Sequence, residues 1–193
     1  MDDRARLRKQ CRLARENLAS AARRAASHTI CRRLHRSSHY WSAHHIAFYW
    51  PLGAEVDLRE LLGAALREGR RCYLPVLRTG RRLWLARDRS GDRLLVNSWN
   101  IPEPRVRARH FLAPALLDLV CVPLVGFDRS GTRLGQAGGY YDRSFEFLRS
   151  GMRGKPRLVG VGFACQELPH IPRAAWDVPL SGVVTEREEI RCP

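Results

Sequence analysis

The sequence lacks the features that mark several large classes of protein. None of its apolar runs approaches the roughly 18 residues of a membrane-spanning helix, and charge begins at Asp2 where a signal segment would be apolar. It contains no CxxC pair, no Walker lysine motif, no GxGxxG fingerprint and no RNP, KH or C2H2 pattern. These absences predict a cytoplasmic protein with no membrane partner, no zinc site and no recognisable nucleic-acid-binding module.

The six cysteines are better explained as buried thiols than as a disulfide framework. Cys72, Cys121 and Cys165 lie in or beside apolar runs, as reduced core cysteines do. We therefore expect these three side chains to be buried in a protein of a reducing compartment.

Acidic residues are also scarce relative to cations. The chain has 19 Asp and Glu against 34 Lys and Arg, a formal net charge of +15, and nearly all of the cations are arginine. This excess suits an anionic partner, either a nucleic acid or a polyanionic small molecule. The arginines are scattered along the chain, which favours ordinary solvated cations for most of them. A basic RNA-binding protein remains an alternative that the charge alone supports.

The length and the apolar pattern predict one α/β domain. A chain of 193 residues is long enough for one sizeable core and short for two, so we expect a single domain over residues 1–193, with a helical segment over 1–37 packed on it. Strands are predicted near residues 45, 73, 120, 160 and 183, the last of them over 182–185, with helices between them. An antiparallel hairpin is expected over 82–96, turning at Ser90 and Gly91. The pattern indicates a three-layer α/β/α fold with a mainly parallel sheet and an added hairpin.

Helix boundaries are predicted from capping residues. Residues 3–36 contain neither Pro nor Gly and should form two helices with a break near Ser20, whose hydroxyl would cap the second. Asp57, followed three residues later by Glu60, predicts the N-cap of a helix that ends at Gly69.

The stretch 122–145, VPLVGFDRSGTRLGQAGGYYDRSF, is the most informative part of the chain. A buried strand ends at Pro123, five glycines follow between Gly126 and Gly139 with no run long enough for a strand, and helical spacing begins at Tyr140. A strand, a glycine loop and a helix start can cradle phosphate, because glycine lets main-chain N–H groups approach a ligand. Such loops also merely turn the chain, and this one would equally suit a phosphosugar isomerase or a CoA-transferase-like enzyme.

Two further residues are candidate ligand contacts. Glu55 follows a strand predicted over 44–50, where it is either a solvated turn residue or a substrate ligand at the carboxyl end of a strand. Trp99 lies in NSWNIPEP, which two prolines should keep irregular, and its ring either plugs the core edge or stacks on a heterocycle.

RLGQAGGYYD, preceded by PLVGFDRSG, resembles the signature of the 5-formyltetrahydrofolate cyclo-ligase family. The resemblance extends to RARLRKQCRLAR, FYWPLGAEVD, WNIPEP and WDVPLSGVVT, and so covers most of the chain in patches. Ala137 stands where the family usually has glycine. Arg4 stands where it usually has lysine, which keeps the charge and changes the donor geometry.

The resemblance implies ATP- and Mg²⁺-dependent conversion of 5-formyltetrahydrofolate to 5,10-methenyltetrahydrofolate, through a phosphorylated formyl (imidate) intermediate, with release of ADP and phosphate. We expect a monomer that acts on folate, with or without a polyglutamate tail, and not on nucleic acid. Asp142 and Asp177 are the implied magnesium residues, although each is equally an ordinary helix-terminal cap. The other implied residues are, for ATP, Arg4, Arg8, Arg133, Leu134, Gly135, Gln136, Ala137, Gly138, Gly139, Tyr140 and Tyr141; for folate, Trp50, Glu55, Trp99, Gln136, Gly138 and Tyr140; and for catalysis, Glu55, Arg133 and Tyr140.

Overall fold

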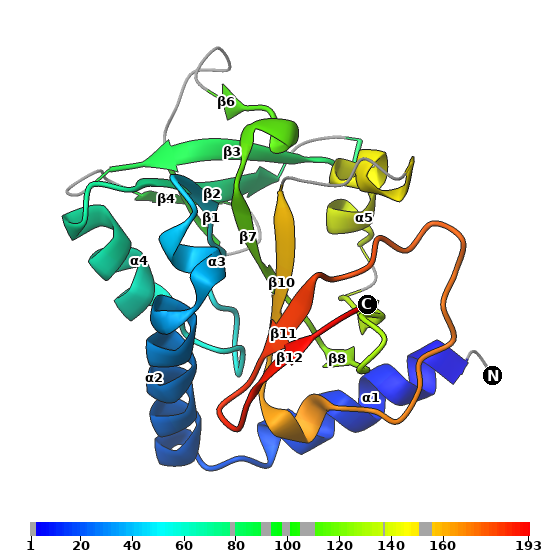
Figure 1. The fold of residues 1–193 in the computed structure, drawn as a ribbon. Coiled ribbons are helices and arrows are strands. Elements are labelled where there is room, and N and C mark those ends of the chain that lie inside the picture. The colour runs from blue at the N-terminus through cyan, green and yellow to red at the C-terminus, as the bar shows by residue number, and fades with distance from the viewer. Residues whose placement is uncertain are drawn as a thin grey trace.

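The computed structural model describes residues 3–77, 80–89, 94–97, 101–104, 111–136, 138–150 and 156–193, and centres on one large sheet (Figure 1). Its eight strands have the order β12-β11-β10-β7-β1-β2-β3-β6. The inner five strands, from β11 to β2, are parallel, and β12, β3 and β6 are antiparallel to their neighbours. The predicted mainly parallel sheet is thus confirmed. The strand bounds are β1 (His45–Ala47), β2 (Arg71–Leu77), β3 (Leu83–Asp88), β6 (Phe111–Leu112), β7 (Leu119–Pro123), β10 (Arg157–Val161), β11 (Gly182–Val184) and β12 (Glu189–Arg191).

The central strand β7 shows why the sheet could be predicted. Its residues 119–122 are all buried, because helices and loops cover both faces of a parallel sheet. Leu119 and Cys121 belong to the core cluster on one face, and Val120 and Val122 to the cluster on the other. A continuous apolar run is the pattern that two buried faces require.

Helices cover the two faces unequally (Figure 1). The helices α2 (Ser20–Arg36), α3 (Ser38–Trp41) and α4 (Arg59–Arg67) pack on one face through a shared apolar cluster. The other face is covered by the short α5 (Tyr140–Ser144), the 3-10 helix η3 (Glu146–Ser150) and irregular chain around Val178 and Leu180. The three-layer α/β/α prediction is confirmed, with one thick and one thin outer layer. Two further 3-10 helices are η2 (Pro114–Leu116) and η4 (Ala164–Gln166).

The first helix, α1 (Asp3–Glu16), lies beyond the carboxyl ends of β7 and β10, beside η4 and the small strand β8 (Figure 1). Its Leu7 and Cys11 pack in a third apolar cluster with Val125, Leu168 and Ile171. This packing brings one face of α1 to the edge of the sheet where ligands of open α/β folds bind.

Two predicted helix caps are wrong. Ser20 is the first residue of α2, and the cap position is Ala19, which makes no side-chain hydrogen bond. Asp57 lies one residue before the cap of α4; its carboxylate accepts from the Arg59 main-chain N–H at 3.0 Å and also bonds the Arg59 side chain. The predicted end of α4 is confirmed, since Gly69 follows the helix with φ 75°.

The strands near the edges differ most from the prediction. The antiparallel hairpin is formed by β2 and β3, whereas β4 (Leu94–Val96) pairs with β5 (Pro102–Pro104) and not with β3. The proline-containing segment therefore includes a strand, which two-stranded edge pairing permits because proline need not donate there. Ser90 and Gly91 lie outside the described residues. β12 was not predicted, so β11 is not the last strand.

The glycine stretch also contains unexpected structure. A two-stranded pair, β8 (Gly126–Phe127) and β9 (Arg133–Leu134), forms inside it. The helix expected from Tyr140 begins there but breaks after five residues, and η3 continues the segment.

All six cysteines are free thiols. Cys72 and Cys121 are buried as predicted, but Cys165, in the short η4, is exposed, so its predicted burial is wrong. Among the described helices, none combines the length and apolar character needed to cross a bilayer.

Candidate functional site

Two cavities open beside the glycine stretch. The first, here called the cationic cavity, has a volume of about 530 Å³ and is lined by six arginines and three carboxylates. The second, the apolar cavity, has about 470 Å³ and is lined mainly by aromatic and aliphatic side chains. Both volumes are typical of small-molecule sites. The two cavities share Arg81, Arg133, Gly135, Gly138, Gly139 and Asp142.

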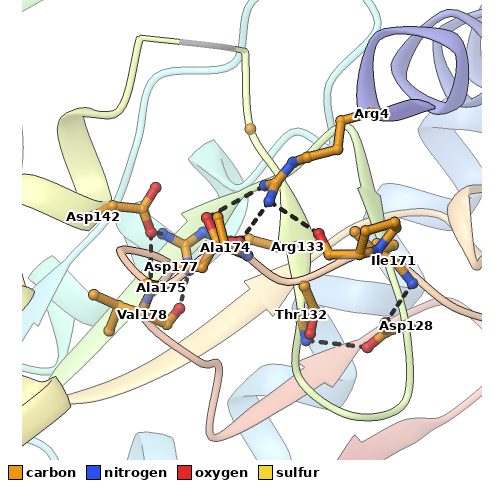
Figure 2. A network of polar contacts seen from close by, with 12 residues as sticks. Arg4, Asp128, Thr132, Arg133, Asp142, Ile171, Ala174, Ala175, Asp177 and Val178 are labelled. Atoms are coloured by element: carbon orange, nitrogen blue, oxygen red, sulfur yellow. Dashed lines mark hydrogen bonds and ion pairs between the residues drawn. The ribbon is translucent and has the colours of Figure 1, made fainter. Parts of the chain in front are cut away.

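Asp128 sets the shape of the β8–β9 turn. Its buried carboxylate accepts main-chain N–H bonds from Thr132 at 3.1 Å and Ile171 at 2.8 Å (Figure 2). It also accepts from the Ser130 main-chain N–H at 3.0 Å. These bonds fix the turn and tie it to the segment after η4. Arg133 follows directly, so its guanidinium leaves the turn in a fixed direction.

Arg133 and Asp142 form one anchored unit between the cavities (Figure 2). Arg133 Nη2 lies 2.6 Å from Asp142 Oδ1, and Arg133 Nη1 donates to the Val178 carbonyl. Val178 N donates back to the same carboxylate oxygen at 3.1 Å. The Arg133 side chain is only 4% exposed, so its geometry is set by this network and not by solvent.

Arg4 and Asp177 form a second unit that lines the cationic cavity (Figure 2). Arg4 Nη1 lies 2.6 Å from Asp177 Oδ2 and Nη2 lies 3.3 Å from Oδ1, while Nη1 also donates to the Pro172 carbonyl at 3.1 Å. Ala174 N donates to Asp177 Oδ2 at 2.8 Å. The carboxylate therefore caps a turn and holds α1 with the same atoms.

The helix α1 presents three arginines at intervals of four residues, which places them on one helical face. Beyond Arg4, Arg8 Nε donates to the Gly135 carbonyl at 3.0 Å, and Arg12 Nη2 donates to Gln136 Oε1 at 2.8 Å. Gln136 Nε2 in turn donates to Glu55 Oε1 at 3.2 Å. The helix thus positions the loop backbone and, through Gln136, a carboxylate of the apolar cavity.

Glu55 has a second fixed contact, because Leu52 N donates to its Oε2 at 3.1 Å. Its half-buried carboxylate lines the apolar cavity beside the buried Tyr49 and the partly buried Tyr141. Burial, reinforced by the Glu55 charge, raises the pKa of both phenols far above the usual value, so both stay protonated. The cavity offers one carboxylate among neutral aromatic walls.

Most predicted site residues are brought together. Arg4, Arg8 and Asp177 line the cationic cavity, and Trp50, Glu55, Gln136, Tyr140 and Tyr141 line the apolar one, with the shared residues between them. Leu134 lines neither: its fully buried side chain belongs to the apolar cluster under α1. Trp99 and Ala137 lie outside the described residues.

Several site residues were not predicted. Arg81, Arg143, Arg149 and Trp176 line the cationic cavity, and Arg12 bonds the loop. The four-residue spacing from Arg8 was a usable signal for Arg12. The position of Arg81 depends on a left-handed backbone, φ 55°, which no sequence pattern announced.

The described residues contain no group of three or more His, Cys, Asp or Glu side chains arranged to hold a metal ion. Asp142 and Asp177 each face an arginine at 2.6 Å. Magnesium commonly keeps several waters and binds through one or two carboxylates together with substrate phosphates. The donor set therefore fits an ion that arrives with a phosphate ligand and does not fit a closed protein-only site.

The fold is an α/β domain in which a cationic cavity and an apolar cavity adjoin beside the glycine stretch. The chain belongs to the 5-formyltetrahydrofolate cyclo-ligase family, whose model matches residues 1–186.

Relatives match along most of the chain. It is 37% identical over 145 residues to the 5-formyltetrahydrofolate cyclo-ligase of Escherichia coli K12, covering 74% of this chain and 78% of the relative. It is 29% identical over 180 residues to that of Haemophilus influenzae, covering 92% and 95%. The solved 5,10-methenyltetrahydrofolate synthetase of Aquifex aeolicus superposes with a TM-score of 0.83 at 34% identity, covering 97% of this chain and 92% of that one. The sequence resemblance is confirmed.

Proposed function

We propose that this chain is an ATP-dependent ligase that converts 5-formyltetrahydrofolate to 5,10-methenyltetrahydrofolate, ADP and phosphate. The observation that carries the proposal is the junction of a cationic and an apolar cavity at Arg133 and the glycines. A phosphoryl donor and a heterocyclic acceptor bound in these two cavities would meet at that junction. Family membership favours this reading over an RNA-binding protein or a phosphosugar isomerase.

The cationic cavity supplies the charge that a triphosphate needs. Its six arginines exceed its three carboxylates, and Arg133 is already held in place by Asp142 and Val178. Because such donors need no rearrangement when charge develops during phosphoryl transfer, they stabilise the transition state efficiently. Gly135, Gly138 and Gly139 let main-chain N–H groups approach the phosphates.

The apolar cavity would hold the folate against Trp50 and Tyr140, with Glu55 orienting it. In the first step the formyl oxygen attacks the γ-phosphorus, an O–P bond forms, and the bond to ADP breaks. In the second step N10 attacks the imidate carbon and loses its proton, a C–N bond forms, and the C–O bond breaks with release of phosphate. The protein contributes positioning and charge neutralisation and needs no covalent nucleophile.

Asp142 would hold Mg²⁺ that enters with ATP, since all hydrogen bonds of its carboxylate to described residues use Oδ1. Asp177 would contribute through water or after Arg4 releases it. When bound, the ion supplies further neutralisation of phosphate charge.

We further propose that the protein is a cytoplasmic monomer organised as one domain over residues 1–193, with residues 1–37 packed on it. Its substrate would be 5-formyltetrahydrofolate either with or without a polyglutamate tail.

The test is appearance of the methenyl chromophore from 5-formyltetrahydrofolate in the presence and absence of ATP. We expect product only with ATP and Mg²⁺, and equal amounts of ADP and methenyl product. A folded protein that binds both ligands and forms no product contradicts the proposal.

A further inference from the structure

Trp176 is an exposed aromatic side chain at the cationic cavity. Its exposed fraction, 66%, is the highest among the large hydrophobic residues that the structure describes. The next most exposed tryptophan, Trp41, packs edge-on against Tyr40 and lies under Arg70. Trp84 packs on Phe111. Among the described residues no ring and no cation stacks on Trp176, yet it lines the cavity with the six arginines.

The backbone that carries Trp176 is firmly held. Asp177 N donates to the Ala174 carbonyl at 3.0 Å and Ala174 N donates to Asp177 Oδ2 at 2.8 Å, which closes a turn with Trp176 inside it. Arg149 Nη1 donates to the Ala175 carbonyl at 2.9 Å, and Arg4 bonds Asp177. Ala174, Ala175 and Asp177 lie together in Figure 2. Single exposed hydrophobic residues are common and need no explanation. Trp176 differs from such residues because two arginines, Arg4 and Arg149, fix its turn and line the same cavity as its side chain.

We propose that Trp176 is the stacking platform for the nucleotide base of ATP. The inference rests on the proposed function, in which the cationic cavity binds the triphosphate. A flat indole stacks on a purine because both present an extended π-face, and such stacking does not require the edge of the base to be read. The ring lies at the cavity wall formed by Arg4, Arg149 and Asp177, so a triphosphate among the arginines would place its base beside the indole.

The proposal predicts that Trp176 contributes to binding of ATP and not of the phosphates alone. Base stacking on an aromatic contributes on the order of 1–3 kcal/mol, so Trp176→Ala should weaken ATP binding about 5- to 150-fold. Inorganic triphosphate lacks a base and should bind the variant within about twofold of wild type. Trp176→Phe should keep most of the ATP affinity, and the Michaelis constant for ATP should follow the binding constant while kcat changes little.

The experiment is calorimetric titration of the full chain with ATP and, separately, with inorganic triphosphate. The control variant is Trp41→Ala, which removes an exposed tryptophan that lines neither cavity and should leave both affinities unchanged. Circular dichroism checks that each variant is folded. Trp176→Ala with wild-type ATP affinity overturns the inference, and so does an equal loss for both ligands, which would mean that Trp176 only shapes the cavity.

These outcomes are distinguishable from failure of the proposed function. Wild type that binds ATP but forms no methenyl product removes the proposed reaction, and the two titrations still decide the role of Trp176. If wild type forms the methenyl product and the Trp176→Ala variant has wild-type affinity for ATP, only the stacking inference is overturned. A wild-type protein that does not bind ATP overturns both.

Discussion

Arg4 and Asp177, 173 residues apart in the sequence, are joined by two hydrogen bonds of 2.6 and 3.3 Å, and both residues line the cationic cavity. The pair is partly buried, with side-chain exposures of 18% and 8%. It connects α1 to the turn that precedes β11. Arg4 is proposed to contact nucleotide phosphate and Asp177 to contact magnesium. In the structure each of these side chains neutralises the charge of the other.

Asp177→Asn should therefore lower stability as well as activity. The amide keeps an oxygen for one donor but loses the charge that holds Arg4 and the Ala174 N–H, and hydrogen bonds to charged groups contribute about 1.5–3 kcal/mol. We expect a loss of about 1–3 kcal/mol in the free energy of unfolding measured in urea. Asp3→Asn is the matched control, because that carboxylate is 71% exposed and pairs only loosely with Arg6 at 3.6 Å. Equal urea midpoints for the two variants would show that the Arg4 pair contributes nothing.

Glu55→Gln should depress turnover and leave stability near wild type. The isosteric amide has one acceptor oxygen for two donors, the Leu52 N–H and Gln136 Nε2, so it loses one exposed hydrogen bond together with the negative charge that orients the folate. A rate reduction of at least tenfold, roughly 1.4 kcal/mol of barrier, is expected in the chromophore assay. Glu60→Gln serves as control, since its carboxylate is 55% exposed and bonds His28 away from both cavities. If the turnover of Glu55→Gln equals that of the control, Glu55 is a solvated turn residue and does not act on the folate.

The parallel part of the sheet could be predicted because buried strands need continuous apolar runs. The run 119–122 was sufficient to identify β7, and similar short runs identified its parallel neighbours. Strands β5 and β12 have three residues each and lie at edges, where the apolar pattern is too short to predict a strand. Strand β4 falls within the predicted hairpin over 82–96, but its partner is β5 and not β3. The cap at Ser20 failed for a related reason: a polar residue near a helix start does not say which residue is the cap.

The site could be predicted only where a motif carried it. Arg8, Arg133 and the glycines follow from local sequence, and the fold brings them to one place. Arg81 comes from a segment with no recognisable motif, and Trp176 opens the matched segment WDVPLSGVVT, where only Asp177 was assigned a ligand role. The proximity of both residues to the loop depends on how the segments after β2 and η4 fold back over the sheet. The local sequence of these segments does not predict where they pass over the sheet.

The glycines of the loop differ in what a methyl group would meet. At Gly135 an added Cβ has no atom within 4 Å, so Gly135→Ala should be as stable as wild type. Its methyl group would project beside both cavities, and ATP affinity should fall at least fivefold, roughly 1 kcal/mol, if phosphate approaches this backbone. Gly139→Ala should lose stability and affinity together, because φ is 66° and the Cβ would lie 2.8 Å from Arg143 Nη1.

The control for backbone strain is Gly69→Ala. Gly69 has φ 75° and open space around its Cβ position, and it lies after α4 away from both cavities. The strain should cost about 1–2 kcal/mol at either positive-φ glycine. Thermal melts and ATP titrations separate the effects, and a Gly135→Ala variant with unchanged ATP affinity would remove this glycine from the phosphate site.

Cys165 should be the first thiol to react. Desolvation raises the pKa of all three thiols, to about 11 for Cys11 and about 12 for Cys31, so these two remain protonated at pH 8. Cys165 differs from them in being exposed, whereas Cys11 and Cys31 are buried. Because the thiolate is the reactive form, a raised pKa and burial both slow alkylation. Iodoacetamide at pH 8 followed by peptide mass mapping should find Cys165 modified first and Cys31 only after unfolding. Early labelling of Cys31 would contradict its burial against α4.

Arg81 combines a strained backbone with a place in both cavities. A non-glycine residue at φ 55° costs about 1–2 kcal/mol, and glycine at that position removes the strain while adding about 0.5–1 kcal/mol of unfolded-chain entropy. Arg81→Gly should therefore be within about 1 kcal/mol of wild type in stability, and at least as stable as Arg81→Ala. Both variants lose the guanidinium at the junction, so both should turn over at least tenfold more slowly.

The adjacent Arg82 is the matched control for Arg81, since it lines neither cavity and pairs at the surface with Glu146 at 2.6 Å. Arg82→Ala removes the same charge one residue away and should leave kcat within about twofold. Steady-state kinetics with each substrate varied, together with urea unfolding, distinguish the explanations. If Arg81→Gly and Arg82→Ala slow the reaction equally, general cationic attraction accounts for the effect. If only the Arg81 variants are slow and Arg81→Gly is the more stable of the two, the strained backbone is retained because it directs a guanidinium to the junction where the two substrates meet.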